Sequence, residues 1–146
     1  MHNPAYNRNQ SHILDIEADI TKISDVLFFI KEDMQTYTID KSIQFNAAMA
    51  TEEIFSNIAL YAYPQKINAL VTILTEMIDD YYCITFVDKG NEYNPLKQVE
   101  PDLISDIKNR KIGGWGVFLS KKLSDDMVYR REDDKNILTI KFNPKK

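Results

Sequence analysis

Two polar residues in a long helix-patterned segment, Glu53 and Asn57, have the types and the spacing to serve one ligand. Residues four apart in an α-helix stand on one face, about one turn from each other. An amide oxygen is a suitable hard ligand for Mg²⁺, which keeps several waters and takes few protein ligands beside substrate phosphates. A neighbouring carboxylate can orient a hydroxyl or a water for attack on a phosphate. Two solvent-exposed polar side chains without a ligand can have the same spacing. Assignment of Glu53 and Asn57 to a binding site therefore depends on other motifs in the chain.

The four glycines of the chain fall in two short stretches, Asp88-Lys89-Gly90 and Gly113-Gly114-Trp115-Gly116. The second stretch precedes an apolar, helix-patterned run, and the free amides at a helix N-terminus form an anion site. Asp88 ends a strand-like run, where its carboxylate can accept a hydrogen bond from an exocyclic amine. Gly90 has no Cβ, so a flat base can lie against its backbone. The alternatives are a plain turn after a strand and a tight loop-to-helix junction. Together the stretches predict an adenine end and a phosphate end of one site.

Length and charge restrict the class of protein. A chain of 146 residues with a net charge of −4 and a pI near 5.2 suits one domain and disfavours a direct nucleic-acid binder, which needs a surplus of Lys and Arg. No apolar run approaches the ~18 residues of a membrane span. The single cysteine, Cys83, cannot form an internal disulfide, so we expect a cytoplasmic protein. We expect Cys83 to be a buried structural thiol, with a reactive thiol as the alternative.

Hydrophobic periodicity predicts the elements that position these residues. Residues 1–10 are expected to form a loose arm before a single domain, 11–146. The expected elements are a strand at 11–17, a helix capped by Asp19 or Thr21 that ends near Tyr37, a helix at 41–63 stopped by Pro64, strands at 69–77 and 81–87, a loop from 89 to 112 with one helical turn near 102–108, a helix at 117–124, and strands at 127–132 and 137–142 joined by a turn at 133–136. This order predicts an α+β, two-layer sandwich with helices on one face of a mixed or antiparallel sheet.

Apolar side chains suggest which helix faces are buried. Phe45, Ala48, Met49, Phe55 and Ile58 are spaced for one face of the helix at 41–63. Phe28, Phe29 and Tyr37 are expected in the core, with a partner or dimer surface as the alternative.

Three motifs in order carry a family resemblance. Residues 53–63 (EIFSNIALYAY) are similar to an N-box, residues 88–95 (DKGNEYNP) to a G1 box and residues 113–119 (GGWGVFL) to a G2 box. The chain from about 11 to 143 thereby resembles the GHKL, or Bergerat-fold, ATP-binding family (HATPase domains), in particular its stand-alone bacterial anti-sigma factor serine kinases of the RsbW/SpoIIAB type.

The resemblance implies a role for each matching residue. It implies Asn57 on Mg²⁺, Glu53 as the catalytic base, Asp88 on the adenine amino group and Gly90 where the base approaches. It implies main-chain contacts to the phosphates from Gly114 and Gly116, further nucleotide contacts from Tyr93, Gly113 and Val117, and an ATP lid at about 95–113.

The chain departs from the family pattern at two places. Kinase members carry a basic lid residue just ahead of the G2 glycines, whereas Ile112 stands there and the candidates Lys111 and Arg110 lie one and two positions earlier. Trp115 replaces a smaller apolar residue, and we interpret it as a packing or lid contact, with stacking on the nucleotide as the alternative. ATP binding is therefore expected more firmly than phosphoryl transfer.

Two functions of different classes follow. The resemblance implies a regulatory kinase that binds Mg-ATP, sequesters a sigma factor and phosphorylates a serine on a STAS-type antagonist. The sequence leaves the oligomeric state open, with a homodimer among the alternatives. The alternative is a non-catalytic module in which ATP switches partner binding. A histidine kinase fits less well, because His2 and His12 are the only histidines, and a P-loop enzyme is excluded because the chain has no GxxxxGK motif.

Overall fold

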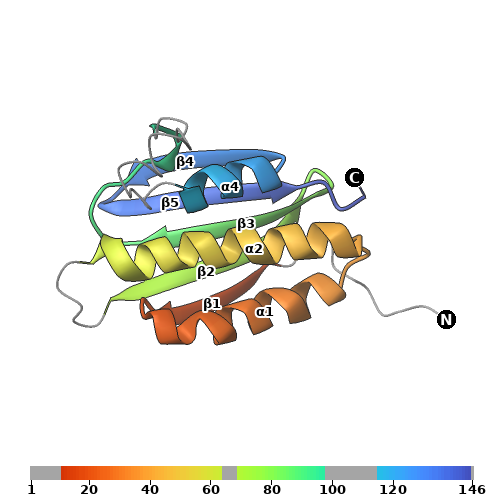
Figure 1. Cartoon of the computed structure of the whole chain (residues 1–146), viewed down its shortest axis with the longest axis horizontal. Coiled ribbons are helices and arrows are strands. Elements are labelled where there is room, and N and C mark those ends of the chain that lie inside the picture. Colours follow the sequence, from red (N-terminus) through yellow and green to blue (C-terminus); the bar gives the residue numbers. More distant parts are fainter. Residues whose placement is uncertain (1–10, 64–68, 98–114, 146) are drawn as a thin grey trace, which may run out of the picture.

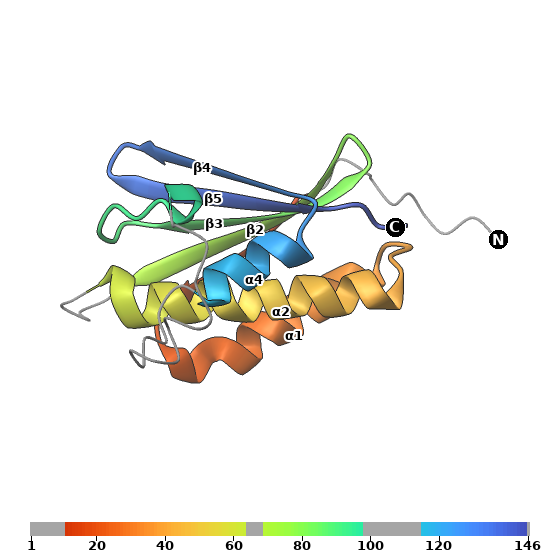
Figure 2. The ribbon, with the colours of Figure 1, turned by 45° about the horizontal axis from the view of Figure 1, so that its top comes forward.

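The computed structural model describes residues 11–63, 69–97 and 115–145, without the side chain of Trp115. These residues form two layers, a five-stranded sheet and a helical layer on one of its faces (Figures 1 and 2). The elements in chain order are β1 (His12–Glu17), η1 (Ile20–Lys22), α1 (Ile23–Gln35), α2 (Lys41–Asn57), the π-helical turn η2 (Ile58–Ala62), β2 (Leu70–Ile78), β3 (Tyr81–Asp88), η3 (Pro95–Lys97), α4 (Trp115–Leu123), β4 (Asp126–Glu132) and β5 (Lys135–Phe142).

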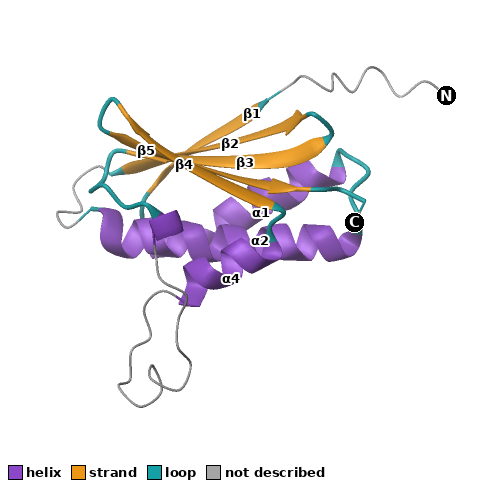
Figure 3. Ribbon diagram, turned by 90° about the horizontal axis from the view of Figure 1, so that it is seen from above, coloured by secondary structure: helices purple, strands orange, loops and turns teal. Residues whose placement is uncertain are grey.

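The sheet has the strand order β1-β2-β3-β5-β4, and every neighbouring pair is antiparallel. The predicted α+β class and two-layer architecture are therefore confirmed, and the sheet is antiparallel throughout the described residues. Figure 3 shows all the drawn helices on the same side of the sheet. Antiparallel sheets commonly cover one face with a core and leave the other in water, which produces the alternating burial of β1, β2 and β5.

Two hairpins close on pairs of aspartates with positive φ. Asp79 and Asp80 have φ of 50° and 67°, and Asp133 and Asp134 have φ of 50° and 60°. Positive φ at both central residues is the requirement of a type I′ turn, and Asp tolerates it better than most residues. The first turn agrees with the predicted hairpin. The four-residue turn expected at 133–136 is wrong, because β5 already begins at Lys135.

The helical boundaries differ from the predicted ones at two places that concern the site. The long helix does not continue uniformly to residue 63, since α-helical bonding ends at Asn57 and a π-helical turn follows. Helix α4 begins at Trp115, so Gly116 lies inside the helix and does not precede it.

Helix α2 lies between α1 and α4 and packs on the sheet through small side chains (Figure 2). Its buried residues include Ala47, Ala50 and Thr51, so the expected burial of Phe45 is wrong and this ring is 64% exposed. Phe28 is also 64% exposed, which contradicts its expected core position. Phe29 and Tyr37 are partly buried against the core, as predicted.

A buried carboxylate ties α1 to the sheet. Asp33 is 6% exposed, and its Oδ2 accepts a hydrogen bond of 2.6 Å from the Tyr82 hydroxyl on β3. Its Oδ1 lies 2.6 Å from Nδ1 of His12 on β1. Burial and the neighbouring Asp33 charge together raise the pKa of Tyr82, so this phenol remains a donor.

Cys83 is buried, as predicted, and burial raises the pKa of its thiol. In the described part of the chain, no helix has the length and hydrophobicity of a membrane span.

Candidate functional site

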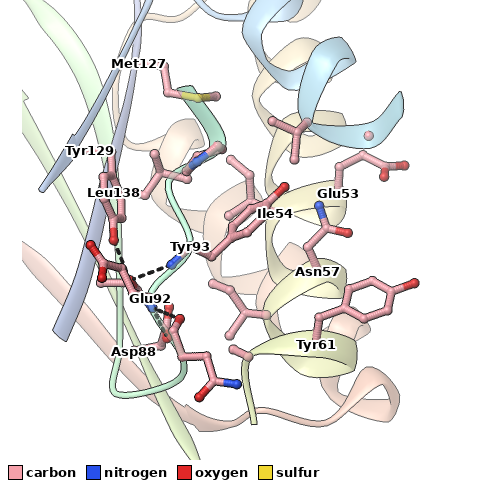
Figure 4. A pocket seen from close by; sticks show the side chains of 17 residues that line it. Glu53, Ile54, Asn57, Tyr61, Asp88, Glu92, Tyr93, Met127, Tyr129 and Leu138 are labelled. Carbon is pink, nitrogen blue, oxygen red and sulfur yellow. Dashed lines mark hydrogen bonds between the residues drawn. The ribbon is translucent and has the colours of Figure 1, made fainter. Parts of the chain in front are cut away.

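A cavity of about 510 Å³ lies between the helical layer and one end of the sheet (Figure 4). Its walls come from α2 and η2, from the start of α4, from the end of β3 with the segment that follows, and from β4 and β5. The lining residues are Glu53, Ile54, Asn57, Ile58, Tyr61, Ala62, Asp88, Asn91, Glu92, Tyr93, Pro95, Gly116, Val117, Met127, Tyr129, Asn136 and Leu138. A mostly apolar cavity of this size with a few convergent polar groups is typical of a small-molecule site.

The helical wall carries the two residues from which the sequence argument began. Glu53, Asn57 and Tyr61 stand on successive turns, and all three line the cavity (Figure 4). The spacing of four therefore brings Glu53 and Asn57 to one cavity, as the helical pattern predicts.

Glu53 contacts the first turn of α4. A Cβ built on Gly116 would lie 2.1 Å from the Glu53 Oε2 atom and 3.1 Å from its Cδ atom. The carboxylate thus occupies the space that any other side chain at position 116 would need. The Gly116 carbonyl accepts a hydrogen bond of 2.8 Å from the buried hydroxyl of Ser120, which holds this turn. Val117, the next residue, is 4% exposed and also lines the cavity.

Asp88 faces this helical wall from the sheet, at the last position of β3. It is 5% exposed, and its Oδ1 accepts two hydrogen bonds of 2.9 Å, from the Gly90 amide and from Asn136 Nδ2. No hydrogen bond from the described residues is made to Oδ2. Desolvation raises the pKa of this carboxyl, while the hydrogen bonds from Asn136 and Gly90 and the charge of Arg131 act in the opposite direction. When it is ionised, Oδ2 can accept a hydrogen bond from a ligand.

Asn136 was predicted to lie in a turn and was not predicted as a site residue. It is the second residue of β5, is 5% exposed and lies directly opposite Asp88. Its Nδ2 also donates to the Asn91 carbonyl at 2.8 Å.

Three donors surround the other end of the Asn136 amide. The Tyr129 hydroxyl, Arg131 Nη1 and the Tyr93 amide donate to Oδ1 at 2.7, 3.1 and 3.3 Å. A reversed amide would place its NH₂ group against these donors, so the network fixes Nδ2 toward Asp88.

Gly90 joins the end of β3 to the π-helical turn. A Cβ at this position would lie 2.5 Å from the Ala62 carbonyl oxygen and 2.6 Å from the Ala62 Cβ. The same carbonyl accepts a hydrogen bond of 2.9 Å from the Asn91 amide. Gly90 lines an adjacent hollow rather than the main cavity. The close approach of Ala62 is a sufficient structural reason for glycine here, while contact with a base stays a prediction.

Apolar and aromatic side chains fill out the cavity walls. Met127, Tyr129 and Leu138 come from β4 and β5, while Ile54 and Ile58 come from the helix opposite. In the sequence, only the alternation of side chains along the last two strands could have shown that Met127, Tyr129 and Leu138 face the cavity. Tyr93, a predicted contact, lines the cavity and is 44% exposed.

Several predicted site residues lie outside the described part of the chain. They are Arg110, Lys111, Gly113, Gly114 and the side chain of Trp115, together with most of the lid expected at 95–113. The described residues contain no group of three or more His, Cys, Asp or Glu side chains that could hold a metal. A Mg²⁺ ion held by Asn57, waters and substrate phosphates needs no such cluster.

Residues 16–142 match the model of the histidine kinase-like ATPase domain family. The chain belongs to this family. The match covers the cavity and every element described above except the first four residues of β1, so the predicted GHKL membership is confirmed.

Two relatives of known name are similar to the chain in sequence. Over 102 residues the chain is 29% identical to the serine-protein kinase RsbW from two strains of Staphylococcus aureus. These alignments cover 66% of this chain and 64% of each kinase, so the chain spans less than two thirds of those relatives.

A solved structure shares the fold. The histidine kinase domain of a blue-light activated histidine kinase from Erythrobacter litoralis superposes with a TM-score of 0.54. The superposition covers 88% of this chain and 62% of that one, at 13% sequence identity. At this identity the likeness concerns the fold alone.

Proposed function

We propose that the cavity binds Mg-ATP, with the adenine at Asp88 and the phosphates toward Asn57 and Gly116. One observation carries the proposal. A buried carboxylate, one oxygen of which accepts no hydrogen bond from the described residues, lies across a cavity of about 510 Å³ from the Glu53–Asn57 pair, in a chain that belongs to an ATPase domain family. The cavity volume falls within the range of about 300–1,000 Å³ that small-molecule ligands occupy.

The acceptor at Asp88 suits adenine because the exocyclic amine of that base is a donor. Oδ1 is already used by two donors of the protein, which leaves Oδ2 for the ligand. The apolar side chains of Ile58, Met127 and Leu138 offer a surface on which a planar base can be buried.

Glu53 and Asn57 are proposed to serve the phosphate end. Bound Mg²⁺ neutralises phosphate charge during transfer. The Asn57 amide oxygen is a ligand of the kind that Mg²⁺ accepts, and Glu53, one turn away, is placed to take the proton of an attacking hydroxyl. Gly90, Tyr93, Val117 and the undescribed Arg110, Lys111, Gly113, Gly114 and Trp115 remain proposed nucleotide contacts.

The proposed activity is that of a serine-protein kinase. The 29% identity to RsbW supports it, and the family resemblance supplies the proposed partners, a sigma factor that is sequestered and a STAS-type antagonist that is phosphorylated on serine. A cytoplasmic location, a homodimer and the absence of direct contact with nucleic acid or membrane belong to the same proposal.

Calorimetric titration of the purified protein with Mg-ATP tests the binding site. Asn57→Ala and Asp88→Asn are expected to abolish binding without unfolding the domain, because neither side chain belongs to the hydrophobic core. Asn46→Ala, on the same helix but outside the cavity, and Asp80→Asn, in the β2–β3 turn, are the matched controls. Unchanged affinity in either site variant would remove that residue from the proposal.

Transfer is tested with γ-labelled ATP and the small protein that co-purifies from native cells. Glu53→Gln is expected to retain ATP binding and to lose phosphorylation of that protein, whereas the same change at its exposed neighbour, Glu52→Gln, should have no effect. Wild-type transfer by Glu53→Gln would refute Glu53 as the base. Binding by the wild type without any transfer would favour the non-catalytic switch module.

A further inference from the structure

The turn that follows β3, at residues 88–91, is attached to the end of the helical segment by one tyrosine. The Lys89 amide donates a hydrogen bond of 2.7 Å to the Tyr63 hydroxyl, and this hydroxyl donates one of 2.9 Å to the Leu70 carbonyl at the start of β2. Burial raises the pKa of the Tyr63 phenol, the hydrogen bond from Lys89 lowers it, and the charge of Asp88 raises it again, with a net increase. The hydroxyl therefore keeps the proton that it donates to Leu70.

An arginine on β4 holds the same turn from the side of the sheet. Nη1 of Arg131 donates to the Gly90 carbonyl at 2.9 Å and to Asn136 Oδ1 at 3.1 Å. This nitrogen carries two hydrogens, so both contacts can form together. Asn136 in turn donates from Nδ2 to Asp88 Oδ1 and to the Asn91 carbonyl. Arg131 is thus connected to the turn both directly and through Asn136.

The backbone of Gly90 is buried, and both of its polar groups have partners. Its amide donates to Asp88 Oδ1 at 2.9 Å, and its carbonyl accepts the hydrogen bond from Arg131. Such partners are needed because an unpaired buried backbone group costs free energy comparable to a lost hydrogen bond. Since the amide of the turn binds the carboxylate, the direction of Asp88 Oδ2 depends on the position of the turn.

Tyr63 and Arg131 lie on the side of the turn that faces away from the main cavity. Both line the adjacent hollow together with Gly90, and neither lines the main cavity, whereas Asp88 does. A ligand in the main cavity therefore meets Asp88 without meeting Tyr63 or Arg131. An effect of these two side chains on such a ligand has to pass through the turn.

We propose that Tyr63 and Arg131 are positioning residues, which hold the turn so that Asp88 Oδ2 is directed at the exocyclic amine of adenine. The proposal rests on the proposed ATP site. An amine donates to the carboxylate, whereas a carbonyl oxygen at the same position of the base places an acceptor against it. Hydrogen bonds weaken steeply as their angle falls below about 120°, so a displaced turn discriminates less well between the two groups. Tyr63 and Arg131 thereby contribute to base selection without touching the base.

Calorimetric titration with Mg-ATP and with Mg-ITP measures this selection, because inosine carries a carbonyl oxygen where adenosine carries the amine. Tyr63→Phe removes the hydroxyl and keeps the ring, and Arg131→Met removes the donors and keeps an unbranched side chain. Each variant should lower the ratio of ATP affinity to ITP affinity about 3–10-fold, as expected for one lost hydrogen bond. A variant that is merely destabilised would bind both nucleotides less well and leave the ratio unchanged.

Matched control variants remove the same groups at positions away from the turn. Tyr81→Phe changes an exposed tyrosine at the start of β3, and Arg130→Met changes the exposed neighbour of Arg131. Both controls should keep the wild-type ratio.

The Arg131→Met variant should also change the pH dependence of binding. Titratable groups face Asp88 from two elements, Tyr63 from the end of η2 and Tyr129 and Arg131 from β4. Burial raises the pKa of Asp88, and the charge of Arg131 acts in the opposite direction. Without this charge the pKa of Asp88 rises further, so the variant should lose ATP affinity at a higher pH than the wild type. The Arg130→Met control should lose it at the wild-type pH.

Amide hydrogen exchange of the nucleotide-free protein tests the attachment of the turn independently of the ATP site. The amides of residues 89–91 should exchange faster in Tyr63→Phe and Arg131→Met than in the two controls. Wild-type exchange at these amides overturns the proposal, and so does an unchanged affinity ratio in variants that bind ATP. Equal affinity of the wild type for ATP and ITP overturns it as well. A wild type that binds neither nucleotide removes the proposed ATP site itself, and the role in base selection with it.

Discussion

Replacing Gly116 by alanine is expected to disable the proposed phosphoryl transfer while the fold is retained. The new Cβ would lie 2.1 Å from Glu53 Oε2, 3.1 Å from its Cδ and 3.4 Å from its Cβ. Favourable contact between heavy atoms begins near 3.5 Å, so the carboxylate oxygen must move by more than about 1 Å. The clashing atom is at the end of a flexible side chain, and rotation of the Glu53 side chain relieves the clash without backbone movement.

The cost to stability should be small for the same reason. Alanine is favoured over glycine inside a helix by about 1 kcal/mol, which offsets the strain of turning Glu53. We therefore expect the free energy of unfolding in urea to change by less than about 1 kcal/mol. Displacement of a catalytic group by about 1 Å can cost 10²-fold in rate, and loss of a general base costs about 10²–10⁴-fold. The rate of transfer should thus fall about 100-fold or more.

Single-turnover transfer from γ-labelled ATP to the proposed antagonist measures this rate, and calorimetry measures ATP affinity separately. A double-mutant cycle supplies the control, because Gly116→Ala should add nothing once Glu53→Ala has removed the carboxylate. Two results would contradict this reasoning. Either the Gly116→Ala variant transfers phosphate at the wild-type rate, or Gly116→Ala slows the Glu53→Ala variant further. In both cases, the reason for glycine at position 116 is not the space that it leaves for the Glu53 carboxylate.

Four further outcomes follow from the structure. Gly90→Ala should cost about 1–3 kcal/mol, measured by urea unfolding, because its Cβ meets the backbone of Ala62, which cannot rotate away. Tyr82→Phe should cost about 1.5–3 kcal/mol in the same assay, since buried Asp33 loses a donor, and a loss below ~0.5 kcal/mol would contradict this. ATP affinity should fall as pH decreases through the raised pKa of Asp88, because a protonated carboxyl loses its acceptor role. Burial raises the pKa of Asp88 in the folded protein above its value in the unfolded chain. Ionisation of Asp88 therefore lowers the free energy of unfolding as the pH rises from the unfolded pKa to the folded pKa. The Asp88→Asn variant should accordingly unfold no more easily than the wild type near pH 7. An affinity in calorimetry that stays constant through the pH interval in which the Asp88 carboxyl titrates in the free protein would contradict the role of Asp88.

The order of elements could be predicted because each carries a local signal. Alternation predicted the first strand, runs of residues that favour β-structure predicted the strands at 69–77 and 81–87, and the Asp79-Asp80 pair indicated the first hairpin. Burial on the helices was less predictable, since it depends on which face meets the sheet. Helix α2 approaches through Ala47 and Ala50, which leaves the larger Phe45 in solvent. The change to π-helical bonding after Asn57 has no signature in the residue types.

Part of the candidate site could be read from spacing along one element. Glu53 and Asn57 share a cavity because a helix repeats every 3.6 residues. Asn136 was missed because four polar residues in a row resemble a loop. The aspartate pair at 133–134 repeats the pattern of the first hairpin, and that repetition could have assigned Asn136 to β5. Its partner Asp88 lies 48 positions away in sequence, a pairing that only the strand register reveals.

The two glycines of the described site are explained first by protein atoms. At Gly90 the space of a side chain is taken by Ala62, at the π-helical turn, and at Gly116 it is taken by the Glu53 carboxylate. Both contacts run from the same helical segment, α2 with η2, one to the residues after β3 and the other to the first turn of α4. The Glu53 side chain can rotate away from position 116, whereas the Ala62 backbone cannot rotate away from position 90. Gly90 therefore sets how closely η2 approaches the end of β3. Substitution of Gly90 should change affinity through the position of η2 even where no ligand atom reaches the glycine, whereas substitution of Gly116 should act through the Glu53 carboxylate.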